Sequence, residues 1–229
     1  MIQVNWKGRF GNHLFQASCA NALSKKFKQQ TLHEWKFILN QNKETQAAIR
    51  NESIIVNNKN IEEIFNSDVN EYNLILDDYF QNKFCIGKFI ELNSYTNPLT
   101  NLEDCTFVHI RLGDIKNVVS LDYKYYQNAI KIAGADNVII SSDSADDEIV
   151  KGLIKEFNAR IFNANEVDTI IKGANCRRKV LSLGTFSWWI GFLGDIFWKQ
   201  ESTVTISPKT NRVRKWHGNI FPMFDWQEI

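Results

Sequence analysis

Between residues 106 and 206, the chain alternates short β-rich apolar segments with segments of helical periodicity. Strands are predicted at residues 106–110, 137–141, 160–162, 180–183 and 203–206. Helices are predicted between them at residues 121–132 and 146–157, within 166–178, and from Thr185 or Ser187 onward. Strands that alternate with helices form parallel sheets through right-handed crossovers, so this half is predicted to be an α/β domain.

The first 97 residues show the same alternation less regularly. Strands are predicted at residues 2–6 and 72–76, a glycine-containing turn at 7–12, and helices at 13–27 and near 61–65. Residues 35–55 give only a weak pattern, and the polar stretch 93–104, which contains Pro98, is predicted to be a linker. We therefore expect two α/β halves, residues 1–97 and 98–210, and a C-terminal tail, 211–229, that packs back on the fold.

The charge balance argues against large anionic partners. The net charge is +1, from 27 basic and 26 acidic residues, so the sequence gives no broad electrostatic footprint for nucleic acid or an anionic membrane. The start of the chain lacks the pattern of a signal peptide. Residues 180–198 are apolar, but they contain Asp195 and three glycines, so we expect a buried core segment and no transmembrane segment. The sequence predicts a soluble cytoplasmic protein, with peripheral membrane association left open.

The cysteines and histidines give no metal-binding pattern. The four cysteines are widely separated and form no Cys-x-x-Cys pair: Cys19, Cys85, Cys105 and Cys176. They are expected to be buried as small hydrophobic side chains in a reducing compartment. The four histidines also lack metal-ligand spacing: His13, His33, His109 and His217. We therefore predict no metal site.

The strand at residues 106–110 ends in the sequence His-x-Arg-x-Gly-Asp, residues 109–114. Side chains alternate along a strand, so His109 and Arg111 are expected to point to one side. Arg111 would then lie at the carboxyl end of a buried strand, where open α/β sheets bind ligands, and its guanidinium suits a phosphate. Gly113 allows the chain to turn there. A surface arginine that pairs with Asp114 remains the alternative interpretation.

Two more strand ends carry polar residues. Ser142 and Asp143 follow the strand at 137–141, and Thr185 and Ser187 follow the strand at 180–183. An aspartate can accept hydrogen bonds from ribose hydroxyls or a base, and hydroxyls before a helix can face phosphate oxygens. Each feature alone is more often a helix cap or a local turn. Their convergence with Arg111 on one sheet edge predicts a nucleotide or nucleotide-sugar site.

Four blocks, in order along the chain, resemble the α-1,2-fucosyltransferase family, glycosyltransferase family 11. They are residues 8–16 (GRFGNHLFQ), 76–81 (LDDYFQ), 109–114 (HIRLGD) and 185–189 (TFSWW). The stretches 121–126 and 206–209 are also similar, so the resemblance spans essentially the whole chain. The chain departs from the family at Leu112, where a second arginine is usual, and at Leu183-Gly184, where Asn-Ser is usual.

The resemblance implies a GT-B-like fold of two Rossmann-like halves, of which the N-terminal one is reduced. Residues 1–97 would form the acceptor side and residues 98–210 would bind the GDP-sugar. The implied reaction is inverting and metal-independent, and it moves L-fucose from GDP-fucose to a glycan acceptor, usually O2 of a galactoside. No cofactor is implied beyond the donor substrate. A diverged, inactive GDP-sugar- or glycan-binding protein and a protein O-fucosyltransferase are the alternatives.

The resemblance also implies roles for individual residues. Arg111 would bind the diphosphate with support from His109 and Asp114. Asp143 and its neighbour Ser142 would contact guanine or ribose. The remaining donor-binding residues would lie at the later block, Thr185, Phe186 and Ser187, and at the opening block, Gly11, Asn12 and His13. The general base stays unassigned, with three candidates: His13, His109 and Asp114.

Overall fold

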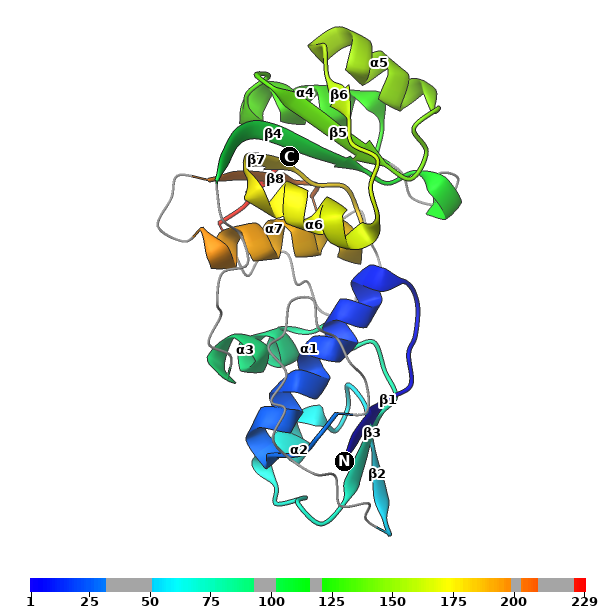
Figure 1. Cartoon of the computed structure of the whole chain (residues 1–229), viewed down its shortest axis with the longest axis vertical. Coiled ribbons are helices and arrows are strands. Elements are labelled where there is room, and N and C mark those ends of the chain that lie inside the picture. The colour runs from blue at the N-terminus through cyan, green and yellow to red at the C-terminus, as the bar shows by residue number, and fades with distance from the viewer. Residues whose placement is uncertain (32–50, 93–101, 116–120, 199–202, 210–224) are drawn as a thin grey trace. The chain divides into compact units, whose positions relative to one another are not determined.

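The computed structural model divides the chain into two compact units. Unit 1 comprises Met1–Thr96 and Trp216–Ile220, and unit 2 comprises Asn97–Lys215 and Phe221–Ile229. The structure describes residues 1–31, 51–92, 102–115, 121–198, 203–209 and 225–229 (Figure 1). Most of the predicted linker and of the weakly patterned region lies outside these residues. Residues 103–104 belong to a strand, so the linker prediction is wrong at its C-terminal end.

Unit 1 is a three-stranded parallel sheet with helices. Its elements are β1 (Ile2–Val4), α1 (Phe10–Phe27), β2 (Ser53–Val56), α2 (Ile61–Asn66), β3 (Asn73–Leu76) and α3 (Lys83–Leu92). The strand order is β1-β3-β2, and Leu74 on the central strand pairs with both Ile2 and Ile54. Leu23, Phe27, Val56 and Leu76 are among the side chains that form the core of this unit.

The sequence predicted α2 and β3 closely and located the first strand and helix with shifted ends. The first helix begins at Phe10 rather than His13, and Arg9 precedes it in an extended conformation. Strand β2 and helix α3 were missed. Strand β2 has only four residues and exposes Ile55, and α3 contains Gly87, so neither gives a clear periodic signal.

Unit 2 is a six-stranded parallel sheet between helical layers. Its elements are β4 (Glu103–Ile110), the 3-10 helix η1 (Gly113–Ile115), α4 (Tyr123–Ala133), β5 (Val138–Ser142), α5 (Glu148–Phe157), β6 (Arg160–Ile161), α6 (Glu166–Asn175), β7 (Cys176–Val180), α7 (Thr185–Phe197), β8 (Val204–Ser207) and β9 (Gln227–Glu228). The strand order is β6-β5-β4-β7-β8-β9. Counted within this unit, the order is 3-2-1-4-5-6, which is that of the Rossmann fold. The predicted α/β class with a parallel sheet is therefore confirmed.

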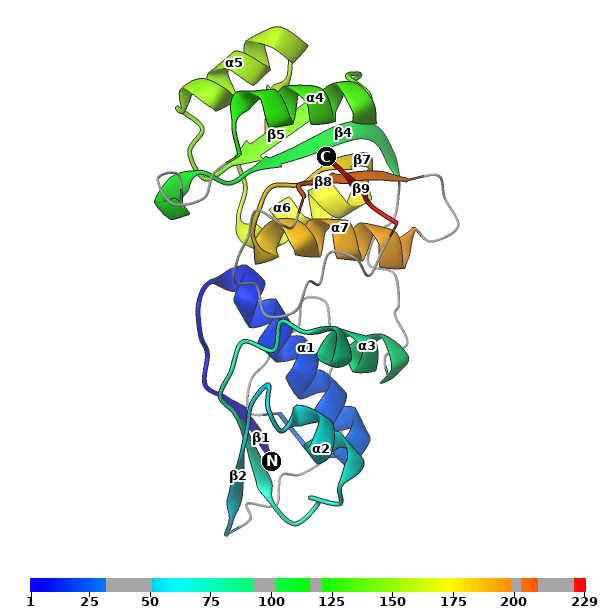
Figure 2. The same ribbon diagram turned by 180° about the vertical axis from the view of Figure 1, so that it is seen from behind.

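Helices cover both faces of this sheet. Figures 1 and 2 show α4 and α5 on one face and α6 and α7 on the other. On the α4 side, Val108, Val138 and Val180 from the strands pack with Tyr126 and Ile130 from α4. The helices begin where the sequence supplies capping side chains. Asp122, Asp147 and Asn165 accept hydrogen bonds from the first turns of α4, α5 and α6.

The strand predicted at residues 180–183 occupies Cys176–Val180 instead. The sequence Arg177-Arg178-Lys179 resembles a solvated charged run, but it forms the middle of β7. Arg178 pairs with Asp104, while Lys179 is completely buried, and its Nζ donates to the Cys176 carbonyl at 3.1 Å. The apolar residues that follow form the buried helix α7, as predicted. Of the helices in the described residues, none combines the length and the apolar character that a membrane crossing needs.

Cys105 and Cys176 form a disulfide bond, with their Cα atoms 5.3 Å apart. The prediction of unpaired cysteines is therefore wrong for this pair. Sequence spacing does not reveal that β4 and β7 are neighbours, and this pairing is what brings the two sulfurs together. Cys19 and Cys85 are buried and free. The prediction of a reducing compartment was based on unpaired cysteines, and this disulfide removes that basis. The cytoplasmic location therefore stays a prediction.

Candidate functional site at the carboxyl ends of β4 and β7

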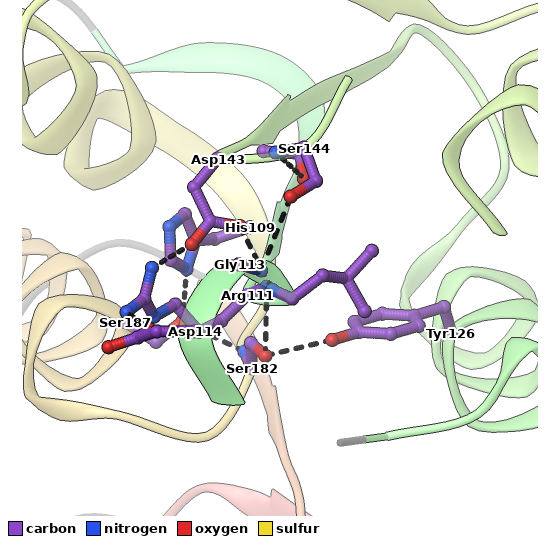
Figure 3. Close-up of polar contacts among 11 residues, drawn as sticks. His109, Arg111, Gly113, Asp114, Tyr126, Asp143, Ser144, Ser182 and Ser187 are labelled. Atoms are coloured by element: carbon purple, nitrogen blue, oxygen red, sulfur yellow. Dashed lines mark hydrogen bonds and ion pairs between the residues drawn. The ribbon is translucent and has the colours of Figure 1, made fainter. Parts of the chain in front are cut away.

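The candidate site lies at the carboxyl ends of the neighbouring strands β4 and β7, where the loops that follow the two strands leave the sheet. The two strands are the first and fourth of the Rossmann order, and their connections run to opposite sides of the sheet. Ligands of such sheets bind outside the carboxyl ends of the strands at this position. The chain continues from β4 into Arg111 and from β7 into Ser182. The Arg111 backbone N–H donates to Ser182 Oγ at 3.2 Å, which joins the two loops (Figure 3).

Arg111 is held by two carboxylates. Its guanidinium forms ion pairs with Asp114, three residues later, and with Asp143 after β5. Asp143 also accepts the Leu112 N–H at 2.9 Å, so one carboxylate fixes both the side chain and the backbone of this loop. The Arg111 side chain remains 18% exposed, and a ligand can therefore reach it. The sequence left two interpretations of Arg111 open, a phosphate ligand and a surface arginine that pairs with Asp114. The pairing with Asp114 is present, and Asp143 is a second partner.

Gly113 permits the close approach of the β5 loop. A Cβ at this position would lie 2.5 Å from Asp143 Oδ2 and 3.2 Å from Arg111 Nη1, closer than ordinary contacts allow. The Gly113 N–H donates to Ser144 Oγ at 3.2 Å. Ser142 stabilises the same turn, because its Oγ accepts the Ser144 N–H at 3.1 Å. Ser142 thus shapes the loop that presents Asp143.

His109 lies beneath the site with its Nδ1 atom 2.6 Å from Ser187 Oγ. Ser187 Oγ also accepts the Ser182 backbone N–H at 2.8 Å. Burial, together with the nearby positive charge of Arg111, lowers the pKa of His109 to about 3. The imidazole is therefore neutral and a weak base, which makes it better suited to positioning groups than to accepting a proton.

Two residues of the site were not predicted, Tyr126 and Ser182. The Tyr126 hydroxyl lies 2.8 Å from Ser182 Oγ, which in turn receives the Arg111 N–H, so α4 supports the Arg111 loop through buried oxygens (Figure 3). Burial raises the pKa of Tyr126, which keeps its hydroxyl protonated. In the sequence, Tyr125 and Tyr126 lie in a predicted helix and in the stretch 121–126 that resembles the family, but no role was assigned to either. No local pattern indicates which hydroxyl reaches the site.

Helix α7 starts at the same edge of the sheet. Thr185 and Phe186 form its first turn after Gly184, whose φ of +117° favours glycine. The Phe186 ring lies 5.0 Å from the His109 ring, so this turn packs on the end of β4. Within the described part of the chain, the first turn of α7 carries no acidic side chain. A helix N-terminus of this kind carries partial positive charge and can face an anion together with Arg111.

The remaining predicted residues belong to unit 1, at the start of α1. Gly11, Asn12 and His13 form the first turn, and Asn12 Oδ1 accepts a hydrogen bond from Gln81 Nε2 at 2.8 Å. The His13 ring packs at 5.2 Å from the ring of Trp6. Gly11, Asn12 and His13 thus lie in the first turn of a helix of unit 1. The predicted residues of the later block lie in the first turn of a helix of unit 2.

The structure brings together the predicted residues of unit 2 around one sheet edge. Arg111, Asp114 and Asp143 form its charged part, and His109, Phe186 and Ser187 pack beneath. The guanidinium and the helix N-terminus are groups that bind phosphate oxygens, and a phosphate would have to displace a carboxylate to pair with Arg111. Comparison with protein-family models, curated proteins and solved structures finds no match to this chain.

Proposed function

We propose that this protein is an inverting, metal-independent fucosyltransferase that binds GDP-fucose in unit 2 and moves fucose to a glycan hydroxyl, with O2 of a galactoside as the expected acceptor. The observation that carries the proposal is the position of Arg111. Arg111 follows the first strand of a 3-2-1-4-5-6 sheet, and its backbone N–H bonds Ser182 in the loop that leads from the neighbouring strand into α7. The family resemblance supplies the donor and the reaction, and a GT-B arrangement of the two units is part of the same proposal.

The chemistry needs a group that stabilises a leaving diphosphate. Breaking the bond between fucose C1 and the phosphate oxygen builds negative charge on that oxygen. Arg111 can donate two parallel hydrogen bonds to it, and the N-terminus of α7 adds favourable partial charge. In this proposal, the diphosphate takes the place of a carboxylate beside Arg111. The displaced carboxylate of Asp143 then accepts hydrogen bonds from the ribose or the guanine.

The other residues would assist this arrangement. Thr185 and Phe186 would contact the phosphate or fucose at the start of α7. Ser187 and His109 would hold that turn against β4. Gly11, Asn12 and His13 of unit 1 would face the donor from the acceptor side, with the general base for the acceptor hydroxyl unassigned.

The direct test measures fucose transfer from GDP-fucose to an array of galactosides and folded protein domains. Arg111→Ala is expected to lower the transfer rate by ~10²–10³, as loss of an oxyanion-stabilising donor does, and Arg111→Lys to recover part of it. Arg160→Ala is the matched control, since Arg160 bonds Asn137 at the opposite edge of the sheet, and it should keep the full rate. Failure to bind GDP, or equal rates for Arg111→Ala and the wild type, would contradict the proposal.

A second candidate is a GDP-sugar-binding protein without catalytic activity. The observation that favours it is the saturation of Arg111 by Asp114 and Asp143, which is also what a structural arginine would show. This candidate predicts GDP binding by calorimetry without turnover on any acceptor. Transfer to protein domains but not to disaccharides would instead identify a protein O-fucosyltransferase.

A further inference from the structure

Three groups that commonly bind metals converge at the amino end of β4, the end opposite to the candidate site. The Glu103 carboxylate and the sulfurs of Cys105 and Cys176 each offer an atom, and these atoms all lie within 4.8 Å of one another. The strand register explains the convergence. Glu103 pairs directly with Cys176 on β7, and Cys105 is two residues further along the strand on which Glu103 lies. A register irregularity between Glu103 and Thr106 accompanies this pairing.

The cluster has a buried part and an accessible part. Both cysteines have no exposed surface, whereas the Glu103 side chain is 41% exposed and pairs with Lys172 of α6. Glu103 thus lies between the sulfurs and solvent, where an incoming cation would meet a carboxylate first. Lys179, whose Nζ bonds the Cys176 carbonyl, places a further positive charge beside the pair.

We propose that the reduced form of this cluster binds one thiophilic divalent cation, Zn²⁺ above all, through Cys105, Cys176 and Glu103. The disulfide and the metal-bound form then exclude each other, because each sulfur either bonds its partner or donates to the cation. Two thiolates and a carboxylate are a ligand set that zinc accepts, with a fourth position left for water. Tetrahedral bond lengths place such ligand atoms roughly 3.6–3.8 Å apart, a separation within the span of this cluster.

The chemical steps balance with a small dithiol as the reductant. The dithiol gives two electrons and two protons to the Cys105–Cys176 bond and becomes a disulfide itself. The two resulting thiols lose their protons when Zn²⁺ binds, so binding releases two protons to solvent. The bound set carries a net charge of −1, and it lies near the Nζ of Lys179, which donates to the Cys176 carbonyl and also interacts with the carboxylate of Asp195. This inference does not depend on the proposed transfer reaction.

The test uses the full chain, reduced by a dithiol and desalted without oxygen, with Co²⁺ as the optical probe and Zn²⁺ as the competitor. Reduced protein is expected to bind one equivalent of Co²⁺ with a thiolate-to-cobalt charge-transfer band and the strong visible bands of tetrahedral cobalt. Zn²⁺ should remove both signals. The oxidised protein should give neither, since its sulfurs are bonded to each other.

Variants separate this site from other thiols. Cys176→Ser should weaken Co²⁺ binding at least ~100-fold and Glu103→Gln about tenfold, on the scale of losses seen when metal-site groups are removed. Lys172→Met should strengthen binding severalfold, because it removes the cation that competes for Glu103. The control is the double variant Cys19→Ala/Cys85→Ala, which removes the two free thiols of unit 1 and should bind normally.

Two results would overturn the inference. One is a reduced protein that binds no Co²⁺ while its other properties are retained. The other is binding that survives Cys176→Ser or disappears in the Cys19→Ala/Cys85→Ala variant, which would place the thiolates in unit 1. Glu103→Gln changes a partly exposed side chain and leaves both cysteines intact, so it tests the ligand set even if a cysteine variant fails to fold.

Discussion

The imidazole of His109 and the hydroxyl of Ser187 meet at 2.6 Å inside unit 2, although 78 residues separate them in the chain. The same hydroxyl oxygen accepts the Ser182 N–H, so one small side chain connects the end of β4, the loop after β7 and the first turn of α7. Both His109 and Ser187 are buried, which prevents water from replacing this contact.

Ser187→Ala is expected to destabilise the protein by ~1–3 kcal/mol, because it leaves the Ser182 N–H and a ring nitrogen of His109 without this oxygen in a buried place. Urea unfolding measures the change. Ser53→Ala, at the exposed start of β2, is the control and should shift stability by no more than ~0.5 kcal/mol. Equal effects of the two variants would show that the contact contributes nothing.

His109 makes stability depend on pH. Its pKa in the folded chain is about 3, below the ordinary value of 6.5, so between these pH values the unfolded chain takes up a proton that the folded chain does not. Stability therefore falls as the pH drops below 6.5, by about 1.4 kcal/mol per pH unit from this group. His109→Gln removes this contribution, so the loss of stability between pH 7 and pH 5 should be smaller by up to ~2 kcal/mol. Urea midpoints at the two pH values measure it, and parallel losses in both proteins would refute the assignment.

The sequence predicted those residues of the site that can be recognised from a single strand and the loop after it. Arg111 follows the strand predicted at residues 106–110, and Asp143 comes two residues after the strand predicted at 137–141, so the strand-end rule was enough to nominate both. The rule works because every strand of a parallel sheet presents its carboxyl end to the same edge. The structure accordingly brings Asp143 to the guanidinium of Arg111.

What the sequence did not predict depends on contacts between distant segments. The charges of Arg177, Arg178 and Lys179 hid β7, because their partners, such as Asp104, come from another strand. The disulfide depends on the same β4–β7 pairing. Alternation along a strand tells which side chains share a face, but it does not tell which strand lies next to it.

Gly113→Ala is expected to disrupt the Arg111 site, since the added Cβ would lie 2.5 Å from Asp143 Oδ2. The carboxylate must move, and this disturbs its hydrogen bond with the Leu112 N–H, which fixes the backbone of the Arg111 loop. GDP affinity, measured by calorimetry, should fall at least ~10-fold if an interaction worth about 1.4 kcal/mol is lost. Gly87→Ala in α3 is the matched control, because a Cβ there meets no atom within 4 Å. That variant should keep its GDP affinity and gain up to ~1 kcal/mol from helix propensity.

Tyr125 and Tyr126 of α4 form a matched pair of buried hydroxyls. Comparing them distinguishes an effect on GDP binding from an effect on the stability of the fold. The Tyr126 hydroxyl lies 2.8 Å from Ser182 Oγ, which receives the Arg111 N–H, whereas the Tyr125 hydroxyl donates to the Leu181 carbonyl at 2.7 Å. Each Tyr→Phe change removes one buried hydrogen bond and should lower stability by ~1 kcal/mol. Only Tyr126→Phe frees the oxygen that holds the Arg111 backbone, so only this variant should also weaken GDP binding. Urea unfolding and calorimetry on both variants measure the two effects, and an equal loss of GDP affinity would mean that α4 supports the site merely through packing.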